Sequence, residues 1–224
     1  MCEVTRIIAI DGPAAAGKSS TARRVAQALG YAFLDTGAMY RAATWRAISK
    51  GIDLDDAEAV TASTEAMGLE MKEEDGLPRV FVDGRDVTEA IRSPEVTGLI
   101  YKVDQIPEVR DCMVRLQRQF GAHGPTTAEG RDIGTVVFPK ARCKIFLDAS
   151  LDERTRRRAR DMEAKGIPVD VEKLRDEIHQ RDEKNRNRDA SPLRPAEDAV
   201  LLDTTTMTLD EVVEAIVQLA RERL

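Results

Sequence analysis

The sequence has few of the residues that mark secreted, metal-rich or membrane-spanning proteins. Its three cysteines are an odd number without C-x-x-C spacing, which indicates reduced thiols in a cytoplasmic protein. Two histidines, His123 and His179, are too few for a histidine-rich zinc site. No apolar run approaches the ~18 residues that cross a bilayer, and no basic segment is followed by a long apolar stretch at the start. We therefore expect neither a membrane span nor a signal peptide.

The charge balance argues against nucleic acid polymers as partners. The formal net charge at pH 7 is −6, so any basic cluster must serve a local purpose. Charged residues make up 33% of the 224 residues and aromatic residues only 4%, which suits a soluble, helix-rich protein. This length corresponds to a single domain, residues 1–224, with room for insertions, and we expect a monomer.

Five short apolar runs predict the strands of a parallel sheet. Each run is bounded by turn residues and ends in an acidic residue, and most are separated by helical patterns. This alternation predicts an α/β fold with helices on both faces of the sheet. Ligands of such sheets bind beyond the carboxyl ends of the strands, so the five carboxylates are expected on the ligand side. The runs are Arg6–Asp11, Tyr31–Asp35, Thr126–Glu129, Cys143–Asp148 and Ala199–Asp203.

A phosphate-binding loop follows the first run. The spacing is G-x-x-x-x-G-K-S, and a helix-favouring segment leads on to Leu29 and Gly30. In this motif the small residues let backbone N–H groups approach a polyphosphate, the lysine reaches the β- and γ-phosphates, and the serine hydroxyl binds Mg²⁺. The motif predicts a P-loop type of fold and a site for a nucleoside triphosphate. That site comprises Gly12, Pro13, Ala14, Ala15, Ala16, Gly17, Lys18, Ser19 and Ser20.

The pattern changes in residues 51–107, which predict a small α+β insertion. A strand is expected in residues 76–82, before a turn at Asp83-Gly84, and residues 88–103 are expected to be helical with a break or restart at Pro94. After the last strand, the capping box Thr208-Leu-Asp-Glu211 predicts the start of the final helix.

The helix predicted for residues 171–188 has a stripe that changes from aliphatic to basic. Burying arginines without an anionic partner is costly, so we expect something negative to meet them. The alternative is a solvated helix end beyond the core. The stripe comprises Leu174, Ile178, Arg181, Asn185 and Arg188.

A run of arginines follows a predicted capping box, Ser150-Leu-Asp-Glu153. Three of them fall within one arc of a helix and are expected to face phosphates, while the others face water. The alternative is that the whole run is a solvated face. A turn at Gly166-Ile-Pro168 would let residues 154–168 fold back as a lid. The arginines of the arc are Arg154, Arg157 and Arg158.

Two further polar clusters follow predicted strands. The run Thr36–Arg41 places a hydroxyl, a glycine and an arginine at the start of a helix, and Glu129–Asp132 places two carboxylates and an arginine in a glycine-flanked turn. Each has a local explanation, with Thr36 as a helix cap and Arg131 paired with Asp132. Their joint occurrence beyond strand ends, beside the phosphate loop, favours a functional site.

In these motifs the chain resembles the bacterial cytidylate kinases of the nucleoside monophosphate kinase superfamily. The motifs occur in the family's order over nearly the whole chain. The second and third are specific to this enzyme type, whereas the phosphate loop marks a wider class. They are Asp11-Gly-Pro-Ala-Ala-Ala-Gly-Lys-Ser, Leu34-Asp-Thr-Gly-Ala-Met-Tyr-Arg, Gly130-Arg-Asp-Ile-Gly-Thr, Lys144-Ile-Phe-Leu-Asp-Ala-Ser and Ser191-Pro-Leu-Arg.

The resemblance implies transfer of the ATP γ-phosphoryl group to CMP or dCMP with Mg²⁺ and without a dedicated general base. It implies a five-stranded core, a substrate-binding insertion near residues 51–107 and a short lid near residues 154–168. Glu129 would organise water around the magnesium. Arg41 and Arg131 would hold the substrate phosphate, Thr36, Arg110, Asp132 and Arg188 would line the pyrimidine pocket, and Arg181 would lie near the sugar and the transferring phosphates.

The chain departs from the family pattern at two positions near the sugar. Asn185 stands where aspartate is expected, and Tyr101 stands where serine is expected. An amide keeps an acceptor and gains donors but loses the charge, so these two positions bear on the handling of the sugar. The reaction class is unaffected.

Three alternatives share the phosphate loop. A P-loop kinase for a sugar acid or another nucleotide is the nearest, but a small acceptor would not need the insertion. A GTP-dependent switch would normally show D-x-x-G and N-K-x-D, and neither spacing occurs. An inactive ATP-binding homologue is disfavoured by Lys18, Ser19 and the intact set of arginines.

Overall fold

The chain folds into two compact units, one made of residues 1–33 and 121–224 and the other of residues 34–120. Cys112 and Cys143 are free and buried, in keeping with the predicted reduced thiols, and Cys2 lies outside the described residues. The predicted insertion, residues 51–107, lies within the second unit. The computed structural model describes residues 6–74, 76–164, 166–188 and 190–224.

The five predicted strands form one sheet in the order β2-β6-β1-β7-β8. β1 pairs in parallel with β6 on one side and with β7 on the other, and β7 pairs in parallel with β8. The strand order therefore reverses at β1, which is where open α/β sheets bind ligands. The predicted α/β fold class is confirmed. The strands are β1 (Ile7–Asp11), β2 (Ala32–Asp35), β6 (Thr126–Gly130), β7 (Cys143–Asp148) and β8 (Val200–Asp203).

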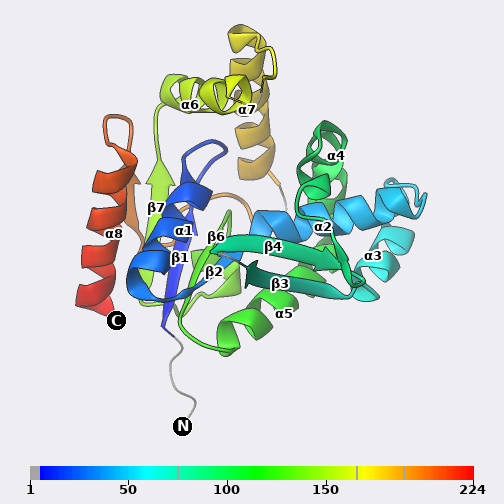
Figure 1. Cartoon of the computed structure of the whole chain (residues 1–224), viewed down its shortest axis with the longest axis horizontal. Helices are drawn as coiled ribbons and strands as arrows, with labels where there is room; N and C mark the ends of the chain where they lie inside the picture. The colour runs from blue at the N-terminus through cyan, green and yellow to red at the C-terminus, as the bar shows by residue number, and fades with distance from the viewer. Residues whose placement is uncertain (1–5, 75, 165, 189) are drawn as a thin grey trace. The chain divides into compact units, whose positions relative to one another are not determined.

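Two helices, α1 (Lys18–Leu29) and α8 (Leu209–Arg223), pack against each other and against the strands of the first unit (Figure 1). Gly30 ends α1 in the left-handed conformation with φ +66°, as its position after the helical pattern predicts. The predicted capping box at the start of α8 is present. The core between these elements includes Ile8, Ile10, Val25, Ile145, Leu147, Val213 and Ile216.

A helical hairpin of α6 (Leu151–Glu163) and α7 (Val171–Arg186) also belongs to the first unit (Figure 1). Gly166, with φ +71°, reverses the chain after α6, which confirms the predicted turn. The helix predicted to reach residue 188 ends two residues earlier. The reason is that the Asn185 carbonyl accepts its hydrogen bond from the backbone N–H of Leu193, at 2.8 Å, so the chain turns back. The buried apolar contacts of the hairpin are Ala159, Leu174 and Ile178.

The second unit combines helices with a small antiparallel sheet in the order β3-β4-β5. Asp83 and Gly84 both have positive φ, +52° and +80°, and make the predicted turn. Its elements are α2 (Thr36–Ser49), α3 (Ala57–Glu65), β3 (Leu69–Glu74), β4 (Leu77–Val82), β5 (Arg85–Asp86), the 3₁₀ turn η1 (Ala90–Arg92), α4 (Pro94–Asp104) and α5 (Pro107–Ala122).

Two features of this unit differ from the sequence-based expectation. β3 was not predicted, because its sequence Leu-Glu-Met-Lys-Glu-Glu has few of the β-branched and aromatic residues that mark strands. The helix predicted for residues 88–103 is a 3₁₀ turn followed by α4. The restart falls at Pro94, where the Ser93 hydroxyl accepts the Val96 N–H.

Arg46 is the polar centre of the second unit. Its buried guanidinium donates to the Asp83 carboxylate at 2.8 Å, to the carbonyl and hydroxyl of Ser63, and to the Ala66 carbonyl at 3.1 Å. The bond from Arg46, followed by the Gly68 N–H, holds the pKa of Asp83 below its usual range. One side chain thus joins α2, the end of α3 and the turn after β4.

We expect Arg46→Met to destabilise the protein by about 3 kcal/mol, because it leaves buried acceptors without donors. Denaturant unfolding of the purified variant measures the change. Arg85→Met is the matched control. Arg85 is exposed and lies over the Trp45 ring at 5.5 Å, so its loss should cost no more than about 1 kcal/mol. Equal stability of the two variants would contradict the central role of Arg46.

Candidate functional site

The phosphate loop follows β1. It requires glycine at position 12 because space is lacking, and it favours glycine at position 17 because the backbone is left-handed there. A Cβ on Gly12 would lie 2.0 Å from the Leu147 carbonyl oxygen of β7, so no other residue fits without moving backbone. Gly17 has φ +89° and Ala15 has φ +59°, both in the left-handed region. A non-glycine residue held there is strained, and such strain is concentrated at functional sites.

The helix that follows the loop has an open N-terminus. Among the described residues, no side chain caps α1, and its first turn contains no acidic residue. Side chains do cap α2, α6, α7 and α8, through Asp35, Ser150, Asp170 and Thr208. The first N–H groups of α1 therefore keep their capacity to bind an anion.

Lys18 lies in the first turn of α1 and is only 6% exposed. Its Nζ donates to the Pro13 carbonyl at 2.7 Å. Burial lowers the pKa of Lys18 to about 7, with a further lowering by Arg131 and Arg181, while Glu129 and Asp11 act in the opposite sense. The ammonium group thus lies in a buried cluster of charged groups of both signs, two arginines and two carboxylates.

The predicted magnesium residues are in contact. The Ser19 hydroxyl donates to the Glu129 carboxylate at 2.6 Å, and Glu129 is buried at the end of β6. A hydroxyl and a carboxylate oxygen are hard ligands of the kind Mg²⁺ takes. No group of three or more His, Cys, Asp or Glu residues suited to a metal occurs in the described part of the chain.

Asp11 links the phosphate loop to the turn that follows β6. Its two carboxylate oxygens accept the backbone N–H groups of Ile133 and Gly134, each at 2.7 Å. Burial raises the pKa of Asp11 to about 7 against the lowering effect of these bonds. The turn carries Arg131 and Asp132 and leads into a π-helical turn, Ile133–Val137, a geometry frequent at functional sites.

The predicted lid residues differ in their surroundings. Arg154 is buried and bonded to the Ala149 and Ala14 carbonyls, at 3.0 Å each, and to Asp182. Arg157 donates to Glu153 and to the Ala16 and Thr204 carbonyls. Arg158 is exposed.

The residues predicted for the sugar and the pyrimidine lie at the end of α7 and just beyond it. The positive charge of Arg181 helps to lower the pKa of Lys18. Asn185 donates through Nδ2 to the Arg181 carbonyl at 2.8 Å. Arg188, which follows the helix, donates through Nε to the Ser191 carbonyl at 2.6 Å. The apolar-to-basic change along α7 is thus present, although Arg188 is not helical.

The second unit holds the other predicted substrate residues. Asp35 accepts the Ala38 N–H, so Asp35 rather than Thr36 is the cap of α2. A Cβ on Gly37 would lie 3.2 Å from both the Arg41 guanidinium and the Asp35 carboxylate, so these two side chains would have to shift slightly to admit a larger residue.

Two more predicted residues lie on the helices that follow. Arg110 of α5 lies over the Tyr40 ring, 5.5 Å from its centroid, and donates to the Asp104 carbonyl. Tyr101 of α4 is 45% exposed.

Sequence reasoning missed what two buried carboxylates of the first unit do. Asp11 was expected on the ligand side of the sheet and in the first family motif, but its bonds to Ile133 and Gly134 were not predicted. Asp182 was overlooked, although Leu174, Ile178 and Asp182 follow one another at helical spacing, i, i+4, i+8. A carboxylate on a buried stripe was the signal that could have identified it.

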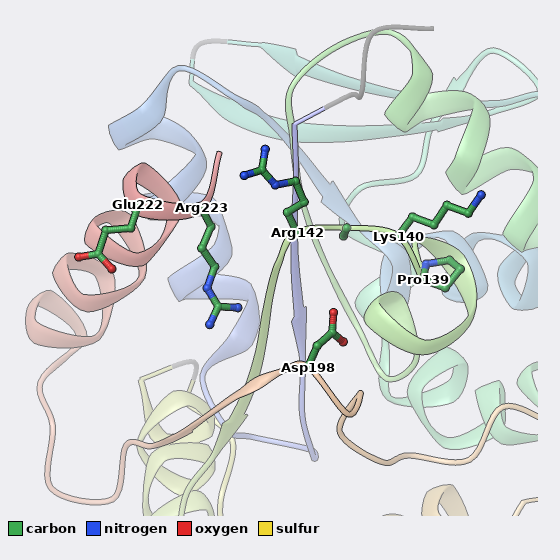
Figure 2. A pocket seen from close by; sticks show the side chains of 7 residues that line it. Pro139, Lys140, Arg142, Asp198, Glu222 and Arg223 are labelled. Atoms are coloured by element: carbon green, nitrogen blue, oxygen red, sulfur yellow. The ribbon is translucent and has the colours of Figure 1, made fainter.

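A separate hollow of about 550 Å³ lies near the amino ends of β7 and β8. Figure 2 shows Arg142, Lys140, Asp198 and Arg223 on its wall. Asp198 pairs with Lys144 at 2.8 Å, and its pKa is lowered by that bond. The phosphate loop follows the carboxyl end of β1, which is parallel to β7. The hollow and the phosphate loop are therefore at opposite ends of these strands.

Comparison with known proteins identifies the family. The sequence profile of the family described as "Cytidylate kinase" matches residues 8–222. The chain is 47% identical to a cytidylate kinase of Geobacillus kaustophilus over 217 residues, covering 97% of both chains. The chain belongs to the cytidylate kinase family. The predicted activity, phosphorylation of CMP and dCMP by ATP, is confirmed at the level of this family.

Two further comparisons bear on length and fold. The chain is 50% identical to a "Bifunctional pantoate ligase/cytidylate kinase" of a Synechococcus species, but spans only 41% of that protein's length. A solved structure of an uncharacterized protein from Eubacterium ventriosum covers 97% of this chain and 99% of its own, with a TM-score of 0.54 and 12% sequence identity. At this level of identity the similarity shows the fold alone. Within the described ranges, no helix is long and apolar enough to span a membrane.

Lys18→Met should lower turnover by about 10²-fold or more if Lys18 contacts the transferring phosphates, as its place in the phosphate-loop motif predicts. Burial disfavours the Lys18 ammonium in the free protein, so we expect the variant to unfold at the same temperature as the parent or higher. Coupled ADP-release kinetics and thermal unfolding measure the two effects.

Lys144→Met is the matched control. Lys144 is also buried but is bonded to Asp198 and to the Pro139 carbonyl. Its loss should reduce stability by about 1–3 kcal/mol with turnover near that of the parent. A Lys18→Met variant that is active, or less stable than Lys144→Met, would contradict this assignment.

Proposed function

We propose that this protein transfers the γ-phosphoryl group of ATP to CMP and dCMP, with Mg²⁺, giving the corresponding diphosphates. The observation that carries the proposal is the geometry at the phosphate loop where, within the described residues, α1 has no side-chain cap and the Ser19 hydroxyl donates to Glu129 at 2.6 Å. The charged groups around Lys18 support it. The pKa of this lysine responds to Glu129 and Arg131, which share the end of β6 and the turn after it, and to Arg181 of α7. Such a cluster suits a site where two phosphate groups approach each other.

On the donor side, the phosphate loop would hold the triphosphate. The open N-terminus of α1 offers backbone N–H groups, and Lys18 would reach the β- and γ-phosphates. Ser19 and Glu129 would hold the magnesium, Ser19 through its hydroxyl and Glu129 through water. When bound, Mg²⁺ supplies charge neutralisation at the phosphate oxygens.

On the acceptor side, Arg131 and Arg41 would bind the phosphate of CMP, because the planar guanidinium matches a phosphate in two hydrogen bonds. Asp132 would accept the cytosine amine, and Arg110 and Arg188 would donate to the ring. Arg181 would lie between the sugar and the transferring phosphates. Thr36, Tyr101 and Asn185 complete the proposed substrate set.

The chemistry needs no dedicated general base, since phosphoryl transfer of this kind depends on positioning and charge stabilisation. The residues near 51–107 would form the part that binds the monophosphate, and those near 154–168 would form the lid, carrying Arg154, Arg157 and Arg158. We further propose a monomeric, cytoplasmic enzyme whose substrates are free nucleotides.

A panel of nucleoside monophosphates tests the proposal. CMP and dCMP should both be substrates, and UMP should have a kcat/KM lower by at least about tenfold, because uracil leaves a buried acceptor without its amine donor. Coupled ADP release with ATP and Mg²⁺ gives the values, with Lys18→Ala as the inactive control. Equal kcat/KM for CMP and UMP would refute the proposed pocket.

Asn185→Asp tests how the sugar is bound. Its Nδ2 already donates to the Arg181 carbonyl, which leaves Oδ1 as the acceptor for a sugar hydroxyl. A charged acceptor is worth about 1 kcal/mol more than a neutral one. The variant also loses the Nδ2 donor, so it should change kcat/KM for CMP or dCMP by up to about tenfold, with the KM for ATP nearly unchanged. Steady-state kinetics on both substrates measure this, and no change for either would remove Asn185 from the substrate set.

A further inference from the structure

Residues of the α6–α7 hairpin contact the phosphate loop through both apolar and hydrogen-bonded contacts. Ala15, the loop residue with φ +59°, packs against the apolar cluster of the hairpin. The neighbouring Ala16 carbonyl accepts from Arg157 at 3.4 Å. The strained part of the loop therefore depends on contacts from α6 and α7.

Asp182 is the buried polar centre of these contacts. Its side chain is 1% exposed, on the face of α7 that continues from Leu174 and Ile178. One carboxylate oxygen accepts the backbone N–H of Ala14 at 3.1 Å, and the other is paired with the Arg154 guanidinium. Asp182 thus bonds directly to the phosphate-loop backbone.

Arg154 completes the arrangement from α6. Its NH1 donates to the Ala14 carbonyl at 3.0 Å as well as to Asp182, and its Nε donates to the Ala149 carbonyl at the end of β7. Both the N–H and the C=O of Ala14 are therefore bonded to one buried ion pair. The sequence predicts that the Arg154 guanidinium faces phosphates, but in the structure it is bonded to the phosphate-loop backbone.

We propose that Asp182 and Arg154 are positioning residues that fix the phosphate loop in its ATP-binding shape. In this role Arg154 acts through the Ala14 backbone and not by touching the phosphates. The inference rests on the proposed function only in taking ATP as the ligand of the loop.

A purely structural purpose explains the pair poorly. A buried ion pair adds little to stability compared with apolar residues of similar size, and α6 and α7 already share an apolar contact. A carboxylate and a guanidinium are, however, well suited to bind an N–H and a C=O of the same residue. The geometry therefore points to control of the loop backbone.

Asp182→Asn and Arg154→Lys test the proposal. The asparagine is nearly isosteric but places an NH₂ group against a donor of Arg154 or Ala14. The lysine keeps the charge opposite Asp182 but loses the fork that reaches two carbonyls. We expect Asp182→Asn to raise the KM for ATP by about tenfold or more with the KM for CMP within about twofold, and Arg154→Lys to have a smaller effect of the same kind.

Hydrogen exchange provides a readout that a general loss of stability would not reproduce. The peptide covering residues 12–19 should exchange faster in both variants, while peptides from α8 should be unchanged. Binding of a non-hydrolysable ATP analogue should weaken in parallel. Asp176→Asn and Arg156→Met, exposed residues of the same two helices, are matched controls and should behave like the parent.

Each outcome decides the inference. Equal increases in both KM values, or unchanged exchange of the loop peptide in a folded variant, would overturn it. If Asp182→Asn does not fold, Arg154→Lys carries the test alone, and parent-like exchange and ATP binding in that variant would also overturn it. Failure of the parent protein to phosphorylate CMP would instead refute the proposed function, since analogue binding and exchange do not depend on the acceptor.

Discussion

The buried ammonium group of Lys18 is the constraint on which the first unit depends. Its pKa is lowered to about 7 by burial and by two arginines, so its surroundings in the free protein disfavour the charged form. The opposing groups, Glu129 and Asp11, come from the ends of adjacent strands. Burying these charged groups is unfavourable in itself, and the apolar core must supply the stability to maintain the cluster.

The acidic residues at the strand ends have two different roles. Asp11, Asp35, Asp148 and Asp203 each accept a nearby backbone N–H and so set the path of a loop or a helix start. Glu129 instead accepts a side-chain hydroxyl of the phosphate loop. The topology places all five at the carboxyl ends of strands, but the partner of each carboxylate is determined by the backbone or side chain that the fold brings to it.

Sequence prediction succeeded for features that depend on local residue types and failed for features that depend on contacts between distant parts of the chain. The strands, the phosphate loop and the Asp83-Gly84 turn were predictable because each depends on local residue types, and all are present. The strand β3 and the π-helical turn after Asp132 were not, since pairing with β4 and bonding to Asp11 create them. Asp182 was missed for a similar reason, because its partners Ala14 and Arg154 are distant in sequence.

An anchored loop has a consequence for the lid. Arg154 is tied to the phosphate loop, and Arg157, one turn farther along α6, donates to both oxygens of Thr204 after β8. The first half of α6 is therefore fixed at two points. If residues 154–168 act as the proposed lid, their motion is left to the second half of the helix and the turn at Gly166. Of the three arginines predicted to face phosphates, Arg158 is exposed and makes neither of these two contacts.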